Sequence, residues 1–362
     1  MFDVTNDAAQ GGRSPRLRAV ALAGLATSSL LMFGACSAPV PATPAETPTT
    51  TVSPAPTQAP TPVAVSRTPV SRVADPTAVD AFPIGLAFSE ASGAVLVTHR
   101  FENTLTINGS GGASRVSVGA SPRGVAVSAD GKRAYVANSA DGTVSVVDLS
   151  GTPKLSDSVA VGQRPVGVAL DAEGAVLYVT NSTDGTLSAV DTESLEVLWT
   201  APVGPRPDGV AVDQASGRVL VVNQFDATVS VVDPEAQLAV DAISVGANPN
   251  GIAIDQAAQR AYVTNAGDAT ISVIDTASLA VLTTVKVEGG PSSVDVDPLA
   301  GAVYAVTQNA VVVIDTQTDQ AVRTIDVGPS LAGLTLDPKS GSVYVVGTTE
   351  KGEGSLYRLV RE

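Results

Sequence analysis

The chain has almost none of the residues that carry most metal, redox and nucleophilic chemistry. Its 362 residues include one cysteine, Cys36, and one histidine, His99. A single cysteine has no partner for an intrachain disulfide, and the zinc motifs CxxC and HExxH are absent. There is also no phosphate-cradling glycine loop and no Ser, His and Asp set in a known catalytic order. We therefore expect no cofactor and no metal ion.

Aromatic and basic residues are scarce as well. Phe, Trp and Tyr make up 4% of the chain, while Val, Ala, Thr and Gly are abundant. This composition favours small side chains packed between sheets over a helical bundle. The chain has 36 acidic and 21 basic residues, a net charge of -15. Such acidity repels phosphate backbones, so we expect no nucleic-acid partner, and it also keeps an exported protein soluble.

The N-terminus has the arrangement of an export signal. Three arginines between residues 13 and 18 precede an uncharged run, Ala19–Ala35, which is followed by Cys36. The sequence FGAC at 33–36 resembles the lipobox of bacterial lipoproteins, which implies a signal peptide at 1–35 and an acylated Cys36. The protein would then be lipid-anchored on the extracytoplasmic face of the cell membrane. The alternative is a secreted protein in which this cysteine is incidental.

A tether is predicted after the signal peptide. Residues 36–69 comprise Cys36 and a tract rich in Pro, Thr and Ala that lacks the hydrophobic density to form a core. In a polyproline II conformation of roughly 3.1 Å per residue, this disordered linker would reach on the order of 100 Å. It would hold a folded domain away from the membrane.

The remaining chain, 70–362, repeats itself with a period of about 42 residues. A small residue opens a Val, Ile and Ala run in each repeat: Gly85, Gly124, Gly167, Gly209, Gly251, Ser293 and Gly333. Short strands at this period predict an all-β, seven-bladed propeller of four-stranded antiparallel blades. The seventh repeat ends one strand short, so we expect an N-terminal strand to complete it and close the ring.

A four-residue motif recurs in the repeats. It reads YVAN at 135–138, YVTN at 178–181, LVVN at 220–223 and YVTN at 262–265. The repeats resemble the YVTN-repeat family of bacterial seven-bladed β-propellers, some of which are similar to surface-layer proteins. The resemblance covers about residues 70–362 and implies the fold. It implies no particular function, because propellers host many activities.

Two polar residues that recur in the repeats are interpreted as structural. An Asp ends the third strand at Asp148, Asp191, Asp233, Asp275 and Asp315. An Asn ends the second strand at Asn138, Asn181, Asn223 and Asn265. The Asp can accept backbone N–H bonds across the following turn, and the Asn amide can bond the local backbone. One Asp per blade spreads the carboxylates around the ring, so they do not converge on a metal ion.

The repeats that depart from the pattern indicate a candidate site. Repeats one, six and seven, which are neighbours in a closed ring, carry His99, Thr307 and Gly347 in place of Asn. The turns that follow are expected on the same face as the channel mouth, which should be bordered by Ile84, Arg123, Val166, Asp208, Asn250, Ser292 and Ala332. The candidate binding residues on this face are His99, Arg100, Glu102, Arg123, Asp208, Asn250, Gln308 and Glu350. The alternative is that these repeats diverge because they meet where the ring closes.

Two functions remain open from sequence. The first is a monomeric, membrane-tethered binding or scaffold module that holds a protein, peptide, glycan or small molecule at the channel mouth. The second is a lactonase-like hydrolase or lyase, with His99 as the candidate general base and Arg100 or Arg123 stabilising an oxyanion. The second function requires these three side chains to reach one substrate.

Overall fold

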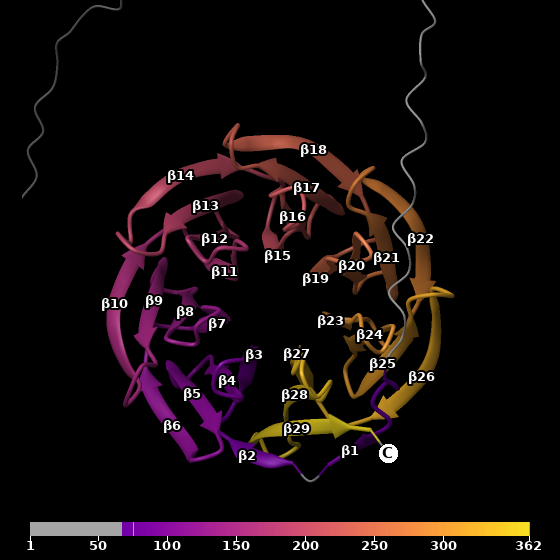
Figure 1. Cartoon of the computed structure of the whole chain (residues 1–362), viewed down its shortest axis with the longest axis horizontal. Helices are drawn as coiled ribbons and strands as arrows, with labels where there is room; N and C mark the ends of the chain where they lie inside the picture. The colour runs from indigo at the N-terminus through magenta and orange to yellow at the C-terminus, as the bar shows by residue number, and fades with distance from the viewer. Residues whose placement is uncertain (1–66, 75, 362) are drawn as a thin grey trace, which may run out of the picture. The chain divides into compact units, whose positions relative to one another are not determined.

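Seven antiparallel sheets stand around a central channel and form a closed ring (Figure 1). This computed structural model describes residues 67–74 and 76–361, so the predicted signal peptide, Cys36 and the linker up to residue 66 lie outside the described residues. All regular elements in the described part are β-strands. The same residues include no helix long and apolar enough to cross a membrane. The predicted all-β, seven-bladed propeller is confirmed.

The first six blades each consist of four consecutive strands. Blades one to three contain β3 (Pro83–Ser89), β4 (Ala94–His99), β5 (Thr104–Gly109), β6 (Gly112–Ser117), β7 (Pro122–Val127), β8 (Arg133–Asn138), β9 (Thr143–Asp148), β10 (Lys154–Ala160), β11 (Pro165–Leu170), β12 (Val176–Asn181), β13 (Thr186–Asp191) and β14 (Val197–Pro202). Blades four to six contain β15 (Pro207–Val212), β16 (Val219–Asn223), β17 (Thr228–Asp233), β18 (Leu238–Ser244), β19 (Pro249–Asp255), β20 (Arg260–Asn265), β21 (Thr270–Asp275), β22 (Ala280–Lys286), β23 (Ser293–Asp297), β24 (Ala302–Val306), β25 (Ala310–Asp315) and β26 (Gln320–Asp326). The first strand of each blade lies nearest the channel (Figure 1).

Blade seven is assembled from both ends of the described chain. It contains β27 (Leu331–Leu336), β28 (Val343–Thr348) and β29 (Gly354–Val360). Its outer edge is formed by β1 (Arg72–Val73) and β2 (Thr77–Val79), which both pair antiparallel with β29. The expected closure by an N-terminal strand is therefore confirmed. Arg67, the first described residue, already contacts the ring: its backbone N–H donates to the Leu299 carbonyl at 3.0 Å, three residues before the predicted start of the domain.

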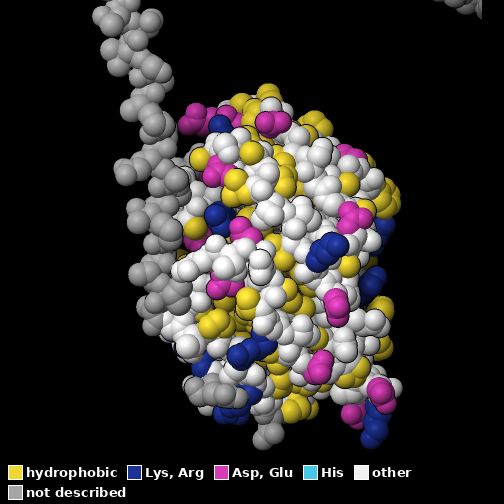
Figure 2. All heavy atoms as spheres, turned by 90° about the vertical axis from the view of Figure 1, so that its right-hand side faces the viewer, with side chains coloured by type: hydrophobic (Ala, Val, Ile, Leu, Met, Phe, Trp, Pro, Cys, Tyr) yellow, Lys and Arg dark blue, Asp and Glu magenta, His cyan; other side chains and the backbone are white. Residues whose placement is uncertain are grey.

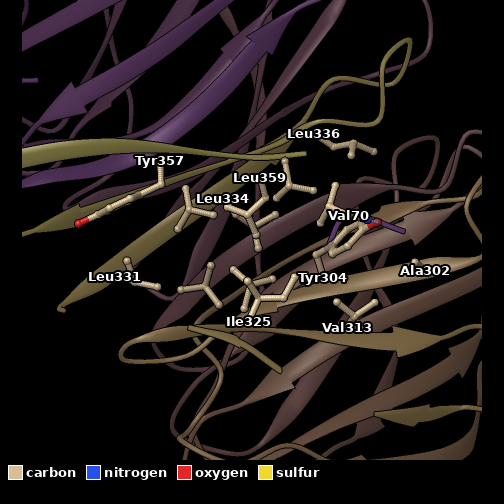
Figure 3. Packing of buried hydrophobic residues seen from close by; sticks show 14 of the residues in the cluster. Val70, Ala302, Tyr304, Val313, Ile325, Leu331, Leu334, Leu336, Tyr357 and Leu359 are labelled. Carbon is tan, nitrogen blue, oxygen red and sulfur yellow. Dashed lines mark hydrogen bonds between the residues drawn. The ribbon is translucent and has the colours of Figure 1, made fainter. Parts of the chain in front are cut away.

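The hydrophobic core is divided into seven layers, one between each pair of neighbouring blades. Each middle strand packs against a sheet on both faces, so β-branched residues occupy consecutive positions, as in TISVID of β21. Figure 3 shows the layer between blades six and seven, where Val70 packs beside Tyr304 and its N–H donates to the Tyr304 hydroxyl at 3.2 Å.

The outer wall of the ring exposes isolated hydrophobic side chains. Figure 2, which looks at the side of β22 and β26, shows them between polar and acidic groups. The larger ones on the outer strands include Leu198, Leu238, Leu282 and Val322. Hydrophobic residues scattered in this way are ordinary on a folded protein surface and indicate no binding site by themselves.

The recurring Asp and Asn residues are both structural, but the Asn residues act differently from the prediction. Asp191 Oδ1 accepts the N–H groups of Glu193 and Ser194 at 3.0 and 2.6 Å, and the other four Asp residues make equivalent turn bonds. The Asn amides bond side chains of the next strand instead of the local backbone. Asn138 Nδ2, for example, donates to Thr143 and Ser145 hydroxyls at 3.0 and 2.9 Å. These buried amides thus tie the second strand to the third.

Candidate binding site at the channel mouth

The central channel contains a cavity of about 250 Å³. All seven residues predicted to border its mouth line it: Ile84, Arg123, Val166, Asp208, Asn250, Ser292 and Ala332. The backbones of Arg123 and Asp208 are fixed by buried hydroxyls of neighbouring blades. Thr98 Oγ1 donates to the Arg123 carbonyl and Thr180 Oγ1 to the Asp208 carbonyl, both at 2.7 Å. The two charged side chains therefore project from a rigid ring of strands.

Two further arginines come from a turn that is repeated before the innermost strands. Arg164 and Arg206 each precede a proline that starts β11 or β15, and their φ angles are 55° and 54°. Four other blades have a residue in the same left-handed conformation here: Phe82, Ser121, Asn248 and Ser330. Because the turn is the same, these six residues occupy equivalent places on one face of the ring.

The charges on this face are strongly unbalanced. Burial lowers the pKa of the Arg123 guanidinium, and the neighbouring Asp208 carboxylate opposes that shift. Three other positive charges also lower the pKa of Arg123: those of Arg100, Arg164 and Arg206. None of these four arginines forms an ion pair among those found in residues 67–74 and 76–361. We call them the arginine cluster.

Asp208 is the carboxylate with the largest effect on the pKa of Arg123. Burial raises the pKa of Asp208 itself, and the arginine charges oppose this rise. The Gln224 amide donates to Asp208 Oδ2 at 2.8 Å and also to Asn250 Oδ1. Asp208 is thereby held within the channel wall. Within the described chain, no group of three or more His, Cys, Asp or Glu residues is placed to hold a metal ion.

Exposed aromatic side chains accompany the arginines. Phe82, Phe101 and Phe225 are 46%, 64% and 70% exposed, and no other aromatic side chain in the described residues is as exposed. Phe82 and Phe101 meet edge to face with their ring centroids 4.9 Å apart. The guanidinium of Arg100 lies 5.4 Å from the Phe101 ring centroid, and that of Arg206 lies 5.0 Å from the Phe225 ring centroid. The face therefore combines positive charge with rigid apolar surface.

The structure brings together only some of the residues predicted for the site. Arg123, Asp208 and Asn250 line the channel cavity, and Arg100 adds its charge to theirs. Glu102 instead accepts a hydrogen bond from Arg115 of β6 at 2.8 Å. Gln308 and Glu350 are exposed on blades six and seven, and neither lines the channel cavity.

His99 is not at the channel mouth. Its side chain is 0% exposed, and both ring nitrogens have partners. Nδ1 donates to the Asp80 carbonyl at 3.1 Å, so the neutral ring presents Nε2 as acceptor to the Thr106 hydroxyl at 2.9 Å. Thr106 follows His99 by seven residues, as Ser145 follows Asn138. His99 thus ties the second strand of its blade to the third, as the Asn does in other repeats. Burial lowers the pKa of the His99 ring.

The other two departures from the Asn pattern also satisfy local packing. The Thr307 hydroxyl is buried and donates to the Ala310 carbonyl at 3.1 Å, which closes its own tight turn. A Cβ at Gly347 would lie 2.8 Å from the Leu331 side chain and 3.0 Å from the Pro329 carbonyl oxygen. These contacts favour the interpretation in which the repeats diverge where the ring closes.

Sequence reasoning missed Arg164, Arg206, Gln224 and Phe225. The predicted mouth residues lie directly before the aligned small residue, whereas these two arginines lie directly before a proline. Comparison of the residues before each proline gives Arg164 and Arg206 in adjacent repeats. The residues after Asn223 are Gln224 and Phe225, and comparison of this position across the repeats would have found them.

Comparisons with known proteins agree with the fold. No curated protein matches the sequence. Among solved structures, Kuenenia stuttgartiensis hydrazine synthase is similar with a TM-score of 0.69 and 17% identity, covering 79% of this chain and 98% of that chain. At this identity the likeness shows the fold alone. The family model described as YNCE-like beta-propeller matches residues 105–260. Over these residues, the chain is similar to the YNCE-like β-propellers.

Proposed function

We propose that the protein is a tethered extracytoplasmic binding module that holds an anionic ligand at its channel mouth. The observation that carries the proposal is the arginine cluster around the channel cavity, which Arg123 and Asp208 both line. Three of its guanidinium charges act on the Asp208 carboxylate, and the fourth, that of Arg100, acts on Arg123. This positive face lies on a chain with a net charge of -15. The ligand class that fits is a carboxylate or phosphate-type anion, which guanidinium groups bind through paired N–H donors.

The position of Arg123 in the channel strengthens its interaction with an anion. Arg123 lies in a channel with partial exclusion of water, where a charge-assisted hydrogen bond is stronger than at an open surface. The acidic outer surface repels anions, so attraction is confined to the channel mouth. The net charge of the chain disfavours a nucleic-acid partner, but it does not describe the local electrostatic potential of this face.

Substitution of Arg123 tests the binding proposal. Arg123→Gln should weaken binding of methylphosphonate, measured by isothermal titration calorimetry at low salt, by about tenfold to a hundredfold, since hydrogen bonds to charged groups contribute roughly 1.5–3 kcal/mol. The matched control is Arg115→Gln. Arg115 lies on the outer strand of the neighbouring blade one, where it pairs with Asp80 and Glu102. If wild-type protein does not bind the anion, or both variants bind it equally, the proposal fails.

The tether is a second part of the proposal and rests on the FGAC sequence and the Pro, Thr and Ala tract. Cys36→Ser should release the protein from the membrane fraction into the medium, because acyl chains on Cys36 would be the anchor. Immunoblotting of cells and medium measures this. Ser37→Ala is the neighbouring control and should leave the protein with the membrane. Full membrane retention of the Cys36 variant would contradict lipid anchoring.

The lactonase-like alternative gains no support from the site geometry. It requires His99 to act with Arg100 or Arg123 on one substrate, but the His99 ring is buried and both its nitrogens are hydrogen-bonded. General acid–base chemistry needs a group within hydrogen-bond reach of the substrate. We therefore propose binding alone.

A further inference from the structure

A second cavity lies beside the channel mouth, between blades three and four. Its volume is about 640 Å³. Its lining includes Arg164, Arg206, Phe225, Pro202, Val203 and Pro205. Two members of the arginine cluster thus line this cleft, whereas Arg123 lines the channel cavity.

The cleft combines an uncovered aromatic ring with fixed positive charge. Phe225 is 70% exposed, and the Arg206 guanidinium lies 5.0 Å from its ring centroid. One carboxylate, Asp184, also lines the cleft. It accepts the Gln163 N–H at 2.7 Å, and it forms no ion pair with either arginine among those found in the described residues. The two guanidinium groups therefore keep their charge available to a ligand, next to apolar surface from Pro202, Val203 and Pro205.

We infer that this cleft binds the aromatic ring of an aryl anion whose charged group is held by the arginine cluster. The inference rests on the proposed function and narrows its ligand class. Planar guanidinium groups stack on aromatic faces, and the Phe225 ring offers a further face or edge to a second ring. An aliphatic group would gain burial against the prolines, but it would lack both ring contacts. The cleft therefore favours an aryl group over an alkyl group of similar size.

The charges of two arginines connect the cleft with the channel. Arg164 and Arg206 line the cleft, and their charges also act on Arg123 and Asp208 in the channel. An anion held by these arginines has its substituent directed either into the channel or into the cleft. The channel cavity of about 250 Å³ is smaller than the cleft of about 640 Å³, so the bulky ring is assigned to the cleft.

Three phosphonates of matched charge test the inference on the full-length chain: phenylphosphonate, cyclohexylphosphonate and methylphosphonate. By isothermal titration calorimetry, phenylphosphonate should bind about tenfold more tightly than methylphosphonate, with cyclohexylphosphonate between them. Phe225→Leu keeps the apolar volume but removes the ring, so it should abolish the advantage of phenyl over cyclohexyl. Phe101→Leu is the matched control, because Phe101 is also exposed beside an arginine but does not line the cleft.

The outcomes separate this inference from the proposed function. If methylphosphonate binds in an Arg123-dependent manner but phenylphosphonate gains nothing over it, anion binding stands and the aryl cleft is wrong. Equal affinity for phenyl and cyclohexyl, or an equal loss in the Phe225 and Phe101 variants, also overturns the inference. If none of the three binds, the proposed function itself fails.

Discussion

Asp297→Asn should destabilise the propeller by about 3–5 kcal/mol, because it leaves buried arginine charge without its carboxylate. The Asp297 side chain is 0% exposed and pairs with Arg67 at 2.6 Å and Arg361 at 3.6 Å. These arginines come from opposite ends of the described chain. The Arg361 Nε also donates to the Thr68 carbonyl at 2.6 Å. The carboxylate therefore joins the N-terminal segment, the C-terminal segment and β23 where the ring closes.

Urea denaturation followed by circular dichroism measures this loss as a lower unfolding midpoint. Asp319→Asn is the matched control, since the Arg260–Asp319 pair is 3.3 Å long but its side chains are 31% and 20% exposed. Because neither side chain of this pair is fully buried, its loss should cost less than the loss of the fully buried Asp297 carboxylate, and the control should unfold closer to the wild type. Equal midpoints for the two variants would show that the Asp297 cluster does not hold the ring closed.

Most of the fold could be predicted because each blade forms its strands from similar residues at equivalent positions of the repeat. Between residues 260 and 275, two β-branched runs predict the strands that the structure has as β20 and β21. The missing strand of repeat seven could be anticipated because an unpaired edge at β29 would be exposed. The ion pairs of Asp297 could not be predicted, because Arg67 and Asp297 are 230 residues apart and no local pattern connects them.

The site was predicted only where it follows the repeat. Arg123, Asp208 and Asn250 were found because one backbone position faces the channel in every blade. His99 was misleading, since a departure from the Asn pattern was interpreted as function although its ring fills the same hydrogen-bonding role. An imidazole and an amide both offer a polar nitrogen at similar reach, which sequence comparison does not reveal.

Total charge was also a poor guide to the local surface. The chain has 36 acidic residues, but the charges that act most strongly on Arg123 are those of one carboxylate, Asp208, and three other arginines. Electrostatic attraction falls off within about 8–10 Å at ordinary ionic strength, so a ligand senses the nearby groups and not the net charge. Only the fold brings arginines of four different blades onto one face.

Gly124→Ala should destabilise the ring by about 1–3 kcal/mol or more through overpacking. A Cβ at Gly124 would lie 2.4 Å from the Val166 carbonyl oxygen of the next blade, and backbone cannot rotate away as a side chain can. The same collision would occur at Gly85, Gly167 and Gly209, at 2.1, 2.3 and 2.4 Å from the neighbouring carbonyl oxygen. The aligned small residue of the repeats is thus required by the close approach of innermost strands.

Gly251→Ala is the matched control at the equivalent position of blade five. Its Cβ would lie 3.3 Å from the Ser292 carbonyl oxygen, and the following repeat already carries Ser293 here. Replacing Gly by Ala in an extended strand recovers about 0.5–1 kcal/mol of backbone entropy, which offsets a contact of this size. The melting temperature measured by thermal unfolding should therefore fall markedly for Gly124→Ala and change little for Gly251→Ala. Equal effects would mean that the ring can expand to accept a side chain, and that strand contact around the channel does not select glycine.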